Sequence, residues 1–159
     1  MDNIRPELRA AAVAIETIRP NPGNPNMGDV DEIRVSLRRF GQFRPVTIDL
    51  RTGWLVTGHH TYAAAYEEGW DRIAVGYVTT VDDVEATAMM LADNGTARRG
   101  ADDPGLLLRA LEALPDLSGT GYTPAGLARL TAAVDVPLSF PVPGDPVGCV
   151  LCGHVPAKD

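Results

Sequence analysis

Apolar and polar residues alternate over short stretches in the first hundred positions, and this pattern predicts strands separated by helices. Residues 13–18 (VAIETI) alternate as a half-buried strand does. Residues 45–50 (PVTIDL), 54–57 (WLVT) and 73–78 (IAVGYV) are three further strand candidates. The RTG turn between the second and third candidates predicts a hairpin.

Helical spacing and capping residues predict three helices in the same region. The first begins after Asp29, which precedes an acidic residue in a capping-box pattern, and stops at Gly41. The second runs from about 59 to Glu68 and ends at Gly69, and the third opens at Asp82 and Asp83. The apolar faces are Val30, Ile33, Leu37 and Phe40 in the first helix, and Val84, Ala88 and Leu91 in the third. Asp93 and Asn94, with Gly95 next, can end that third helix.

The pattern changes after Gly100, where two helices are predicted as a pair. One follows Asp103 and Pro104, and the other follows Thr123 and Pro124. Their apolar faces are narrow and the joining segment is rich in turn residues, so we expect the pair to pack on the main domain or on a partner. We therefore divide the chain into a leader (1–12), an α/β domain of the α+β type (13–100), a helical extension (101–136) and a flexible, proline-rich tail (137–159).

Length and charge set further limits. The 159 residues suffice for one compact domain plus a tail, and a hydrophobic fraction of 45% is typical of a folded protein. No apolar run approaches the ~18 residues of a membrane span, and the start of the chain lacks a hydrophobic signal core. We expect no membrane partner and a cytoplasmic location.

The net charge of −7 argues against a generally basic surface that binds nucleic acid. Any contact with DNA must therefore be local. Arg34, Arg38, Arg39 and Arg44 form one basic cluster, and Arg98 with Arg99 forms another. Each cluster can equally be a solvated helix face.

The segment from Trp54 to Gly69 carries the strongest chemical signal. A strand enters a helix through Gly58, so free backbone N–H groups and the positive end of the helix dipole point to one spot. His59, His60 and Thr61 occupy the first helical turn, and their side chains can donate to a phosphate. The histidines can also act as acid–base groups or metal ligands, or they can simply cap and pack the helix.

Two cysteines near the end of the chain suggest a second, weaker site. Cys149 and Cys152, followed by His154, resemble half of a zinc knuckle. A closed structural zinc site needs four ligands, and no second half-site is present. We therefore favour a reduced cysteine pair over zinc binding.

Three segments in this order resemble the N-terminal domain of the ParB/sulfiredoxin superfamily, over about residues 13–100. They are VAIETIRPNPGNPN, the FGQFRPVTI to TGHHTYAAAYEEGW succession, and VEATAMMLADNGTARRG. The resemblance is greatest to the small ParB-like nuclease-domain proteins of bacteria and phages. It implies a small mixed sheet with flanking helices.

The resemblance also implies a ligand. In the superfamily, the segment matching Gly58–Ala65 binds nucleotide phosphates, CTP in chromosome-partition proteins and ATP in sulfiredoxin and a related free-serine kinase. Other contributors match Gln42, Arg44, Asn94, Arg98 and Arg99. A nucleoside triphosphate, CTP or ATP, with magnesium is the implied cofactor.

This chain departs from the family pattern at several points. Partition proteins have Gly-Glu-Arg-Arg where this sequence has Gly58, His59, His60 and Thr61, so both forked phosphate contacts of arginine are missing. The motif has no cysteine, which argues against sulfiredoxin activity. About sixty residues follow Arg99, so we do not expect a full DNA-sliding clamp.

Three hypotheses follow. The first is a nucleotide- or nucleic-acid-phosphate-binding protein that acts in DNA transactions. The second is a metal-dependent nuclease or NTP-using phosphotransferase with His59, His60 and Asp93 as catalytic residues, for which Asp49, Asp82 and Asp83 are the other candidate carboxylates. The third is a module with a decayed pocket, which binds a protein partner or a second copy through the C-terminal helices.

Overall fold

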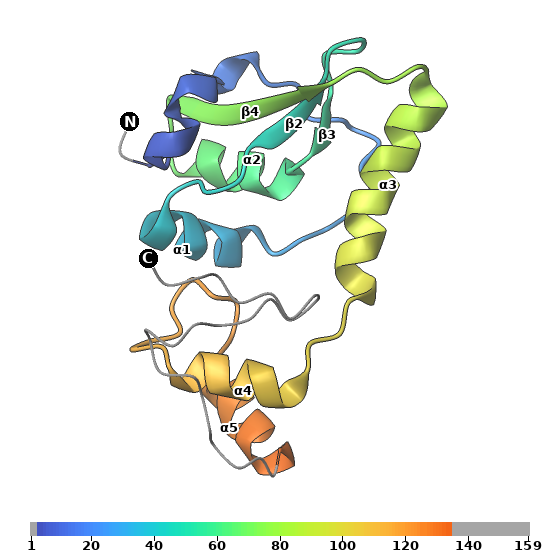
Figure 1. Ribbon diagram of the computed structural model, residues 1–159. Coiled ribbons are helices and arrows are strands. Elements are labelled where there is room, and N and C mark those ends of the chain that lie inside the picture. Colours follow the sequence, from blue (N-terminus) through green and yellow to red (C-terminus); the bar gives the residue numbers. More distant parts are fainter. Residues whose placement is uncertain (1–2, 135–159) are drawn as a thin grey trace, which may run out of the picture.

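Within residues 3–134, which the computed structural model describes, four strands form one mixed sheet (Figure 1). The side chains of residues 97–99 are excluded from the description. The elements are η1 (Pro6–Ala11), β1 (Ala12–Ala14), η2 (Ile15–Thr17), α1 (Val30–Phe40), β2 (Val46–Asp49), β3 (Leu55–Thr57), α2 (His59–Glu67), β4 (Arg72–Val78), α3 (Asp83–Arg99), α4 (Pro104–Glu112) and α5 (Pro124–Ala133).

The strand order is β1-β4-β2-β3. β4 pairs antiparallel with β1 and parallel with β2, while β2 and β3 form the predicted antiparallel hairpin. The parallel β2–β4 pair requires a crossover, which is made by β3 and α2. The predicted α/β fold with a small mixed sheet is confirmed.

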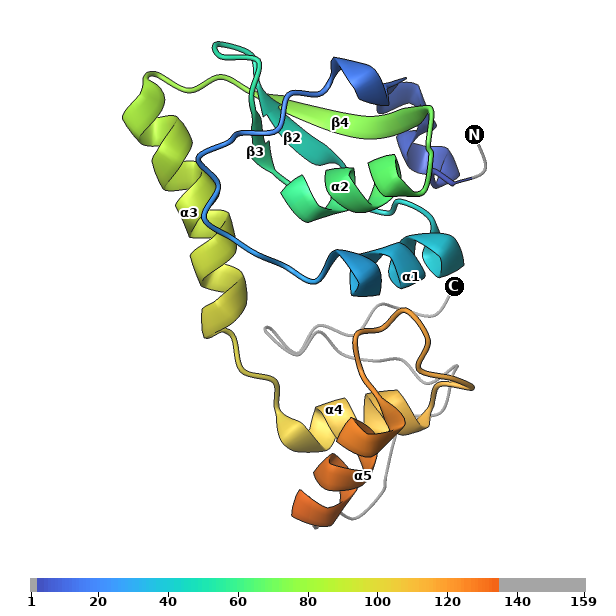
Figure 2. The ribbon, with the colours of Figure 1, turned by 180° about the vertical axis from the view of Figure 1, so that it is seen from behind.

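The helices α2 and α1 are stacked below the sheet, with α2 between the sheet and α1 (Figures 1 and 2). Leu55, Ile73, Ala64 and Ala65 are fully buried where α2 meets the strands. Because alanine has a short side chain, α2 lies close to the sheet and its N-terminus is held firmly at the end of β3.

Residues 3–11, which we expected to be part of a leader, pack onto the domain. Ile4 is buried and pairs with Gln42 in an isolated parallel bridge, in which Arg5 N donates to Gln42 O at 3.0 Å. Gln42 N in turn donates to Asn3 O at 2.7 Å. The start of the chain is therefore fastened to the end of α1, and Ile4 belongs to the hydrophobic core.

The first predicted strand is shorter than its alternating pattern suggested. β1 ends at Ala14, and the chain turns through the 3₁₀ segment η2. The buried side chains are Ile15 and Ile18, three positions apart, and Ile18 N donates to Ile15 O at 3.1 Å. A spacing of three residues suits a 3₁₀ turn and does not suit a strand, in which every second residue faces the core.

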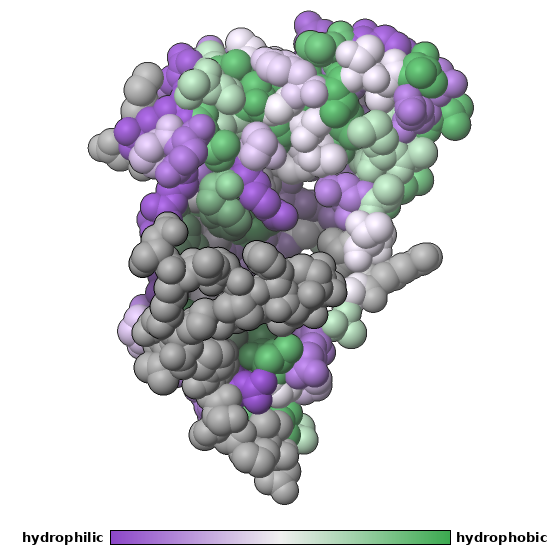
Figure 3. All heavy atoms as spheres, viewed as in Figure 1, coloured by the Kyte–Doolittle hydropathy of each residue, from purple (hydrophilic) through white to green (hydrophobic). Residues whose placement is uncertain are grey.

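α3 differs from its prediction in length and in orientation. It continues past Asp93, Asn94 and Gly95 to Arg99. Its predicted apolar face is exposed, since Val84 is 76% and Leu91 48% accessible, and Met90 is buried instead. Hydrophobic residues accordingly reach the surface around the start of α3 (Figure 3). Among the described helices, α3 included, none is long and apolar enough to cross a membrane.

α4 and α5 form the predicted helical pair, below α1 (Figure 1). Arg39 of α1 forms an ion pair with Asp116 at 2.6 Å, and Gly119 packs against the backbone of Ser36. An apolar groove of about 790 Å³ lies between the two helices and includes Leu127. The tail that carries Cys149, Cys152 and His154 lies outside the described residues.

Candidate phosphate-binding site

The start of α2 is built around a glycine that no other residue can replace without strain. Gly58 has a φ of +83° and is the N-terminal cap of α2. A Cβ atom at this position would lie 2.7 Å from Val46 Cγ1 in the neighbouring strand. The left-handed backbone and the close strand together require glycine. The turn ends β3 and begins α2 next to β2.

The first backbone N–H groups of α2 have no capping side chain. Tyr62 N donates to Gly58 O at 2.9 Å, so the N–H groups of His59, His60 and Thr61 precede the first bond of the helical ladder. By contrast, α1, α3, α4 and α5 are each capped by a side chain, from Asp29, Asp82, Asp103 and Thr123 respectively. The start of α2 therefore presents donors and a positive dipole end that suit an anion.

His59 faces α3. Among the described residues, its buried Nε2 atom has no hydrogen-bond partner. Burial lowers the pKa of His59, as does the nearby His60, while the negative charge of Asp93 on α3 raises it. The net effect is a lowered pKa, so the imidazole is neutral at pH 7 and Nε2 can accept a proton or make one hydrogen bond with a ligand.

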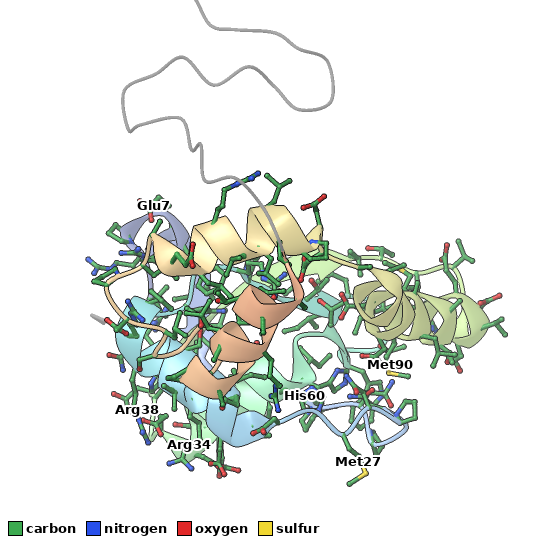
Figure 4. The ribbon with its side chains drawn as sticks, turned by 90° about the horizontal axis from the view of Figure 1, so that it is seen from below. Glu7, Met27, Arg34, Arg38, His60 and Met90 are labelled. Atoms are coloured by element: carbon green, nitrogen blue, oxygen red, sulfur yellow. The ribbon has the colours of Figure 1, made fainter. Side chains whose placement is uncertain are left out.

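His60 holds a loop in place. Gly28 N donates to His60 Nε2 at 2.8 Å, and Asn26 O lies 3.1 Å from the same nitrogen. In Figure 4, His60 lies beside the loop that carries Met27, and Arg34 and Arg38 lie towards the other end of α1. The imidazole therefore binds the segment before α1, which limits its use as a phosphate donor.

Asn94 fastens the same loop to α3. Asn26 Nδ2 donates to Asn94 Oδ1 at 3.0 Å, and Asn94 Nδ2 donates to Asn24 Oδ1 at 3.1 Å. The loop is thus held between α2 and α3, next to the start of α2. Sequence reasoning found His60 and Asn94 but missed their partners Asn24, Asn26 and Gly28.

Thr61 lies on another side of α2, together with two other predicted site residues. It lines a small cavity of about 140 Å³ with Gln42 and Arg44. The amide of Gln42 is buried, donates to Ala74 O at 2.9 Å and accepts from Ala74 N at 2.7 Å. Gln42 therefore joins the segment between α1 and β2 to β4. Arg44 in the same segment is exposed and can move towards a ligand.

The first basic cluster is largely neutralised by acidic partners. Glu68 bonds Arg34 Nε at 2.7 Å and Arg38 Nη2 at 2.6 Å, and Arg39 pairs with Asp116. The hydrogen bond from Arg38, followed by that from Arg34, lowers the pKa of Glu68 to about 2. The side chains of the second cluster, Arg98 and Arg99, are outside the description.

Most of the candidate carboxylates are occupied elsewhere in the fold. Asp49 is fully buried at the end of β2, Asp82 caps α3, and Asp83 pairs with Arg51 at 2.5 Å. Asp93 is exposed on the part of α3 that faces His59. Within the described residues, no three His, Cys, Asp or Glu side chains come together to hold a metal ion.

Burial raises the pKa of Asp49, but hydrogen bonds outweigh that effect. Thr80 donates to the carboxylate from its backbone N at 3.0 Å and from its hydroxyl at 2.9 Å, and Thr52 and the backbone of Arg51 also donate. The result is a pKa of about 2. Asp49 therefore joins the β2–β3 turn to the segment that leads into α3, and it has a structural role.

The fold was compared with solved structures. The structure of C-terminally truncated ParB from Caulobacter crescentus, complexed with CTP-gamma-S, matches with a TM-score of 0.52 and 18% identity over 75% of this chain and 68% of that chain. The chain has a ParB-like fold.

Two further matches are weaker. A Pnob8-like ParB-N domain gives a TM-score of 0.47 at 21% identity over 61% of this ParB-like chain and 41% of that chain. Caulobacter crescentus ParB complexed to the centromeric parS site gives 0.42 at 18% identity, over 76% and 64% of the two chains. No family model matches the sequence, and no curated protein matches it.

Proposed function

We propose that this ParB-like protein binds the phosphates of a nucleotide or of nucleic acid at the start of α2, and that it acts in DNA transactions. The observation that carries the proposal is the N-terminus of α2, where three backbone N–H groups follow Gly58 without a side-chain cap. The fold match to a ParB complexed with CTP-gamma-S supports a nucleotide as the ligand.

The side chains determine how strong such a site is. His59 is neutral and His60 is bonded to the loop, so neither supplies the fixed positive charge of an arginine. Affinity then depends on the backbone N–H groups, the helix dipole, His59 Nε2 and Arg44. We expect weaker triphosphate binding than two forked arginine contacts would give.

Magnesium fits this site only as a companion of the nucleotide. Mg²⁺ keeps several waters and is commonly bound through substrate phosphates and one or two carboxylates. Asp93 is the candidate carboxylate beside the start of α2. Magnesium would therefore enter with the triphosphate.

The decisive experiment compares a charged and a neutral variant at the same position. Thr61→Asp places a carboxylate in the first turn, where it repels phosphate while favouring the helix dipole by about 0.3–1 kcal/mol. Thr61→Asn is the matched neutral variant. Thermal shift and calorimetry would measure each protein with CTP, ATP, GTP and short duplex DNA, with and without magnesium.

We expect the natural protein and Thr61→Asn to be stabilised by at least one ligand, and Thr61→Asp to lose that response at an equal or higher Tm. Equal responses of the two variants would remove the start of α2 as the binding site. No response of the natural protein to any ligand would overturn the proposal.

One observation favours turnover as a second function. A neutral imidazole whose nitrogen can take a proton, under the influence of a carboxylate, has the character of a general base. His59 Nε2 has no partner among the described residues, and the charge of Asp93 acts on this imidazole. A nuclease or phosphotransferase would release product from plasmid DNA or an NTP with Mg²⁺ or Mn²⁺. Asp93→Asn should then abolish product while binding is retained, and product that persists in this variant would exclude Asp93.

A further inference from the structure

A second candidate site, lined by arginines, lies at the opposite end of α1 from the start of α2. A hollow of about 330 Å³ separates the turn η1 from the end of α1. Four of its lining residues are arginines, namely Arg5, Arg9, Arg38 and Arg39, and none of its described lining residues is acidic. With 11 residues, α1 is about 16 Å long, so this hollow and the start of α2 are separate sites.

The backbone around the hollow is rigid. The bridge between Ile4 and Gln42 joins the start of the chain to the residue after Gly41. A Cβ atom at Gly41 would lie 2.8 Å from Asn3 O, and the glycine has a φ of +68°. The two walls of the hollow therefore meet too closely for any residue but glycine, and the arginines project from a fixed frame.

Three of the arginines are held in position by contacts outside the hollow or at its edge. Arg9 Nε donates to Ile4 O at 3.0 Å, Arg38 forms a forked pair with Glu68, and Arg39 Nη1 bonds Asp116. Ser118 O also accepts from Arg39 Nη1, but Arg38 Nη1 and Arg39 Nη2 have no hydrogen-bond partner among the described residues. An arginine held in this way loses little side-chain entropy when it binds an anion.

This concentration of arginines does not follow from composition, since the whole chain has a net charge of −7. Arg38 and Arg39 in the last turn also complement the negative end of the α1 dipole. That role does not account for Arg5 and Arg9, which come from a different element. In Figure 3, hydrophilic residues gather on this side of the molecule, near η1 and the end of α1.

We infer that this hollow, formed by Arg5, Arg9, Arg38 and Arg39, binds phosphate groups of a nucleic-acid backbone. Arginine forks match phosphate geometry, and a DNA strand presents a charge about every 3.4 Å. The lining offers no free aromatic face for a base, because the guanidinium of Arg39 lies over the Phe40 ring at 4.8 Å from its centre. A backbone phosphate fits this lining better than a base does.

Arg5 gives the cleanest test because it is exposed and its side chain has no bond to a described residue. The full-length protein, Arg5→Gln and Arg5→Glu would be titrated with a labelled short DNA duplex by fluorescence anisotropy, over about a fourfold range of salt. The control is Arg129→Gln, which removes one charge from an exposed residue of α5. Melting curves would verify that all variants are folded.

We expect the natural protein to bind duplex with an affinity that falls as salt rises. Arg5→Gln should reduce the slope of log affinity against log salt by about 0.9, the value for one phosphate contact, and Arg5→Glu should reduce affinity further. Arg129→Gln should leave the slope unchanged. Equal losses in Arg5→Gln and Arg129→Gln would overturn the inference.

Two further arms separate the sources of phosphate and the two proposed sites. If inorganic phosphate or an NTP, at constant ionic strength, displaces the duplex from the Thr61→Asp variant, in which the α2 site is disabled, the hollow takes free phosphate and the nucleic-acid assignment fails. Binding of an acidic peptide but not of duplex would also overturn it. Arg5→Gln should reduce the salt slope by the same amount in the Thr61→Asp background, so failure of the α2 site leaves this test intact.

Discussion

The contact between Gly28 and His60 allows a quantitative test of how the loop before α1 is held. A Cβ atom at Gly28 would lie 2.8–2.9 Å from three atoms of the His60 ring, so Gly28→Ala must displace the ring or the loop. Displacement of the ring is an overpacking effect, which typically costs about 1–3 kcal/mol. Displacement of the loop loses the Gly28–His60 hydrogen bond, worth about 1 kcal/mol, and weakens the two bonds to Asn94.

By either route we expect Gly28→Ala to lower the free energy of unfolding by about 2 kcal/mol. For a chain of this size, that loss corresponds to a fall in Tm of about 4–8 °C. Urea unfolding followed by tryptophan fluorescence measures the change, since Trp70 is buried in the core and Trp54 lies at the edge of the sheet.

The matched control is Gly100→Ala. A Cβ atom there meets no described atom within 4 Å and the φ of Gly100 is −64°, so we expect no loss and a gain of up to about 1 kcal/mol from the stiffer unfolded chain. His60→Ala in the Gly28→Ala background should relieve the clash. The loss of stability in the double variant should therefore be smaller than the sum of the two single losses, by more than about 0.5 kcal/mol. Equal stabilities of Gly28→Ala and Gly100→Ala, or simple additivity in the double variant, would refute the contact.

Three further predictions concern charged and polar groups. The pKa of Asp49 is about 2, below its ordinary 3.8. Its carboxylate should therefore add about 2 kcal/mol to the free energy of unfolding above pH 4, and this contribution is lost as pH falls towards 2. In urea titrations, Asp49→Asn should be less stable at pH 7, and its free energy of unfolding should fall less steeply as the pH is lowered. Glu68→Gln removes the partner of Arg34 and Arg38 and should lower the Tm at low salt. The difference in Tm from the natural protein should shrink below pH 4 and in high salt. An unchanged Tm would show that the ion pairs contribute nothing to stability. His59→Leu removes a buried nitrogen without a described partner, so calorimetric melting should show an equal or higher Tm, and a clear fall would mean that Nε2 is bonded in solution.

Local sequence signals predicted most of the fold. α1 begins where Asp29 accepts from Glu32 N at 3.1 Å and ends at Gly41, because both caps act within a few residues of the helix end. The failures have two causes. Ile4 is buried because of a distant contact with Gln42, whereas α3 passes through Gly95 because one glycine costs only about 1 kcal/mol in a helix.

The candidate site was predictable to the same extent. The glycine turn into α2 is encoded in neighbouring residues, and the structure has it at the predicted position. The structural roles of His60, Gln42 and Asn94 depend on hydrogen-bond partners that lie about thirty or more residues away in sequence. No periodicity or motif specifies which hydrogen bonds such side chains make, so their assignment required the fold.

The strand order has a consequence for how the protein folds during synthesis. β1 is made near the start of the chain, yet its partner is β4, with Ala12 opposite Ala74. At about 5–20 residues per second, a ribosome needs roughly 3–12 s to make the intervening segment. During this delay β1 remains an unpaired edge, and closing so long a loop favours slow folding. Substitutions that weaken β4 should therefore reduce the yield of folded protein in the cell more than their effect on equilibrium stability implies.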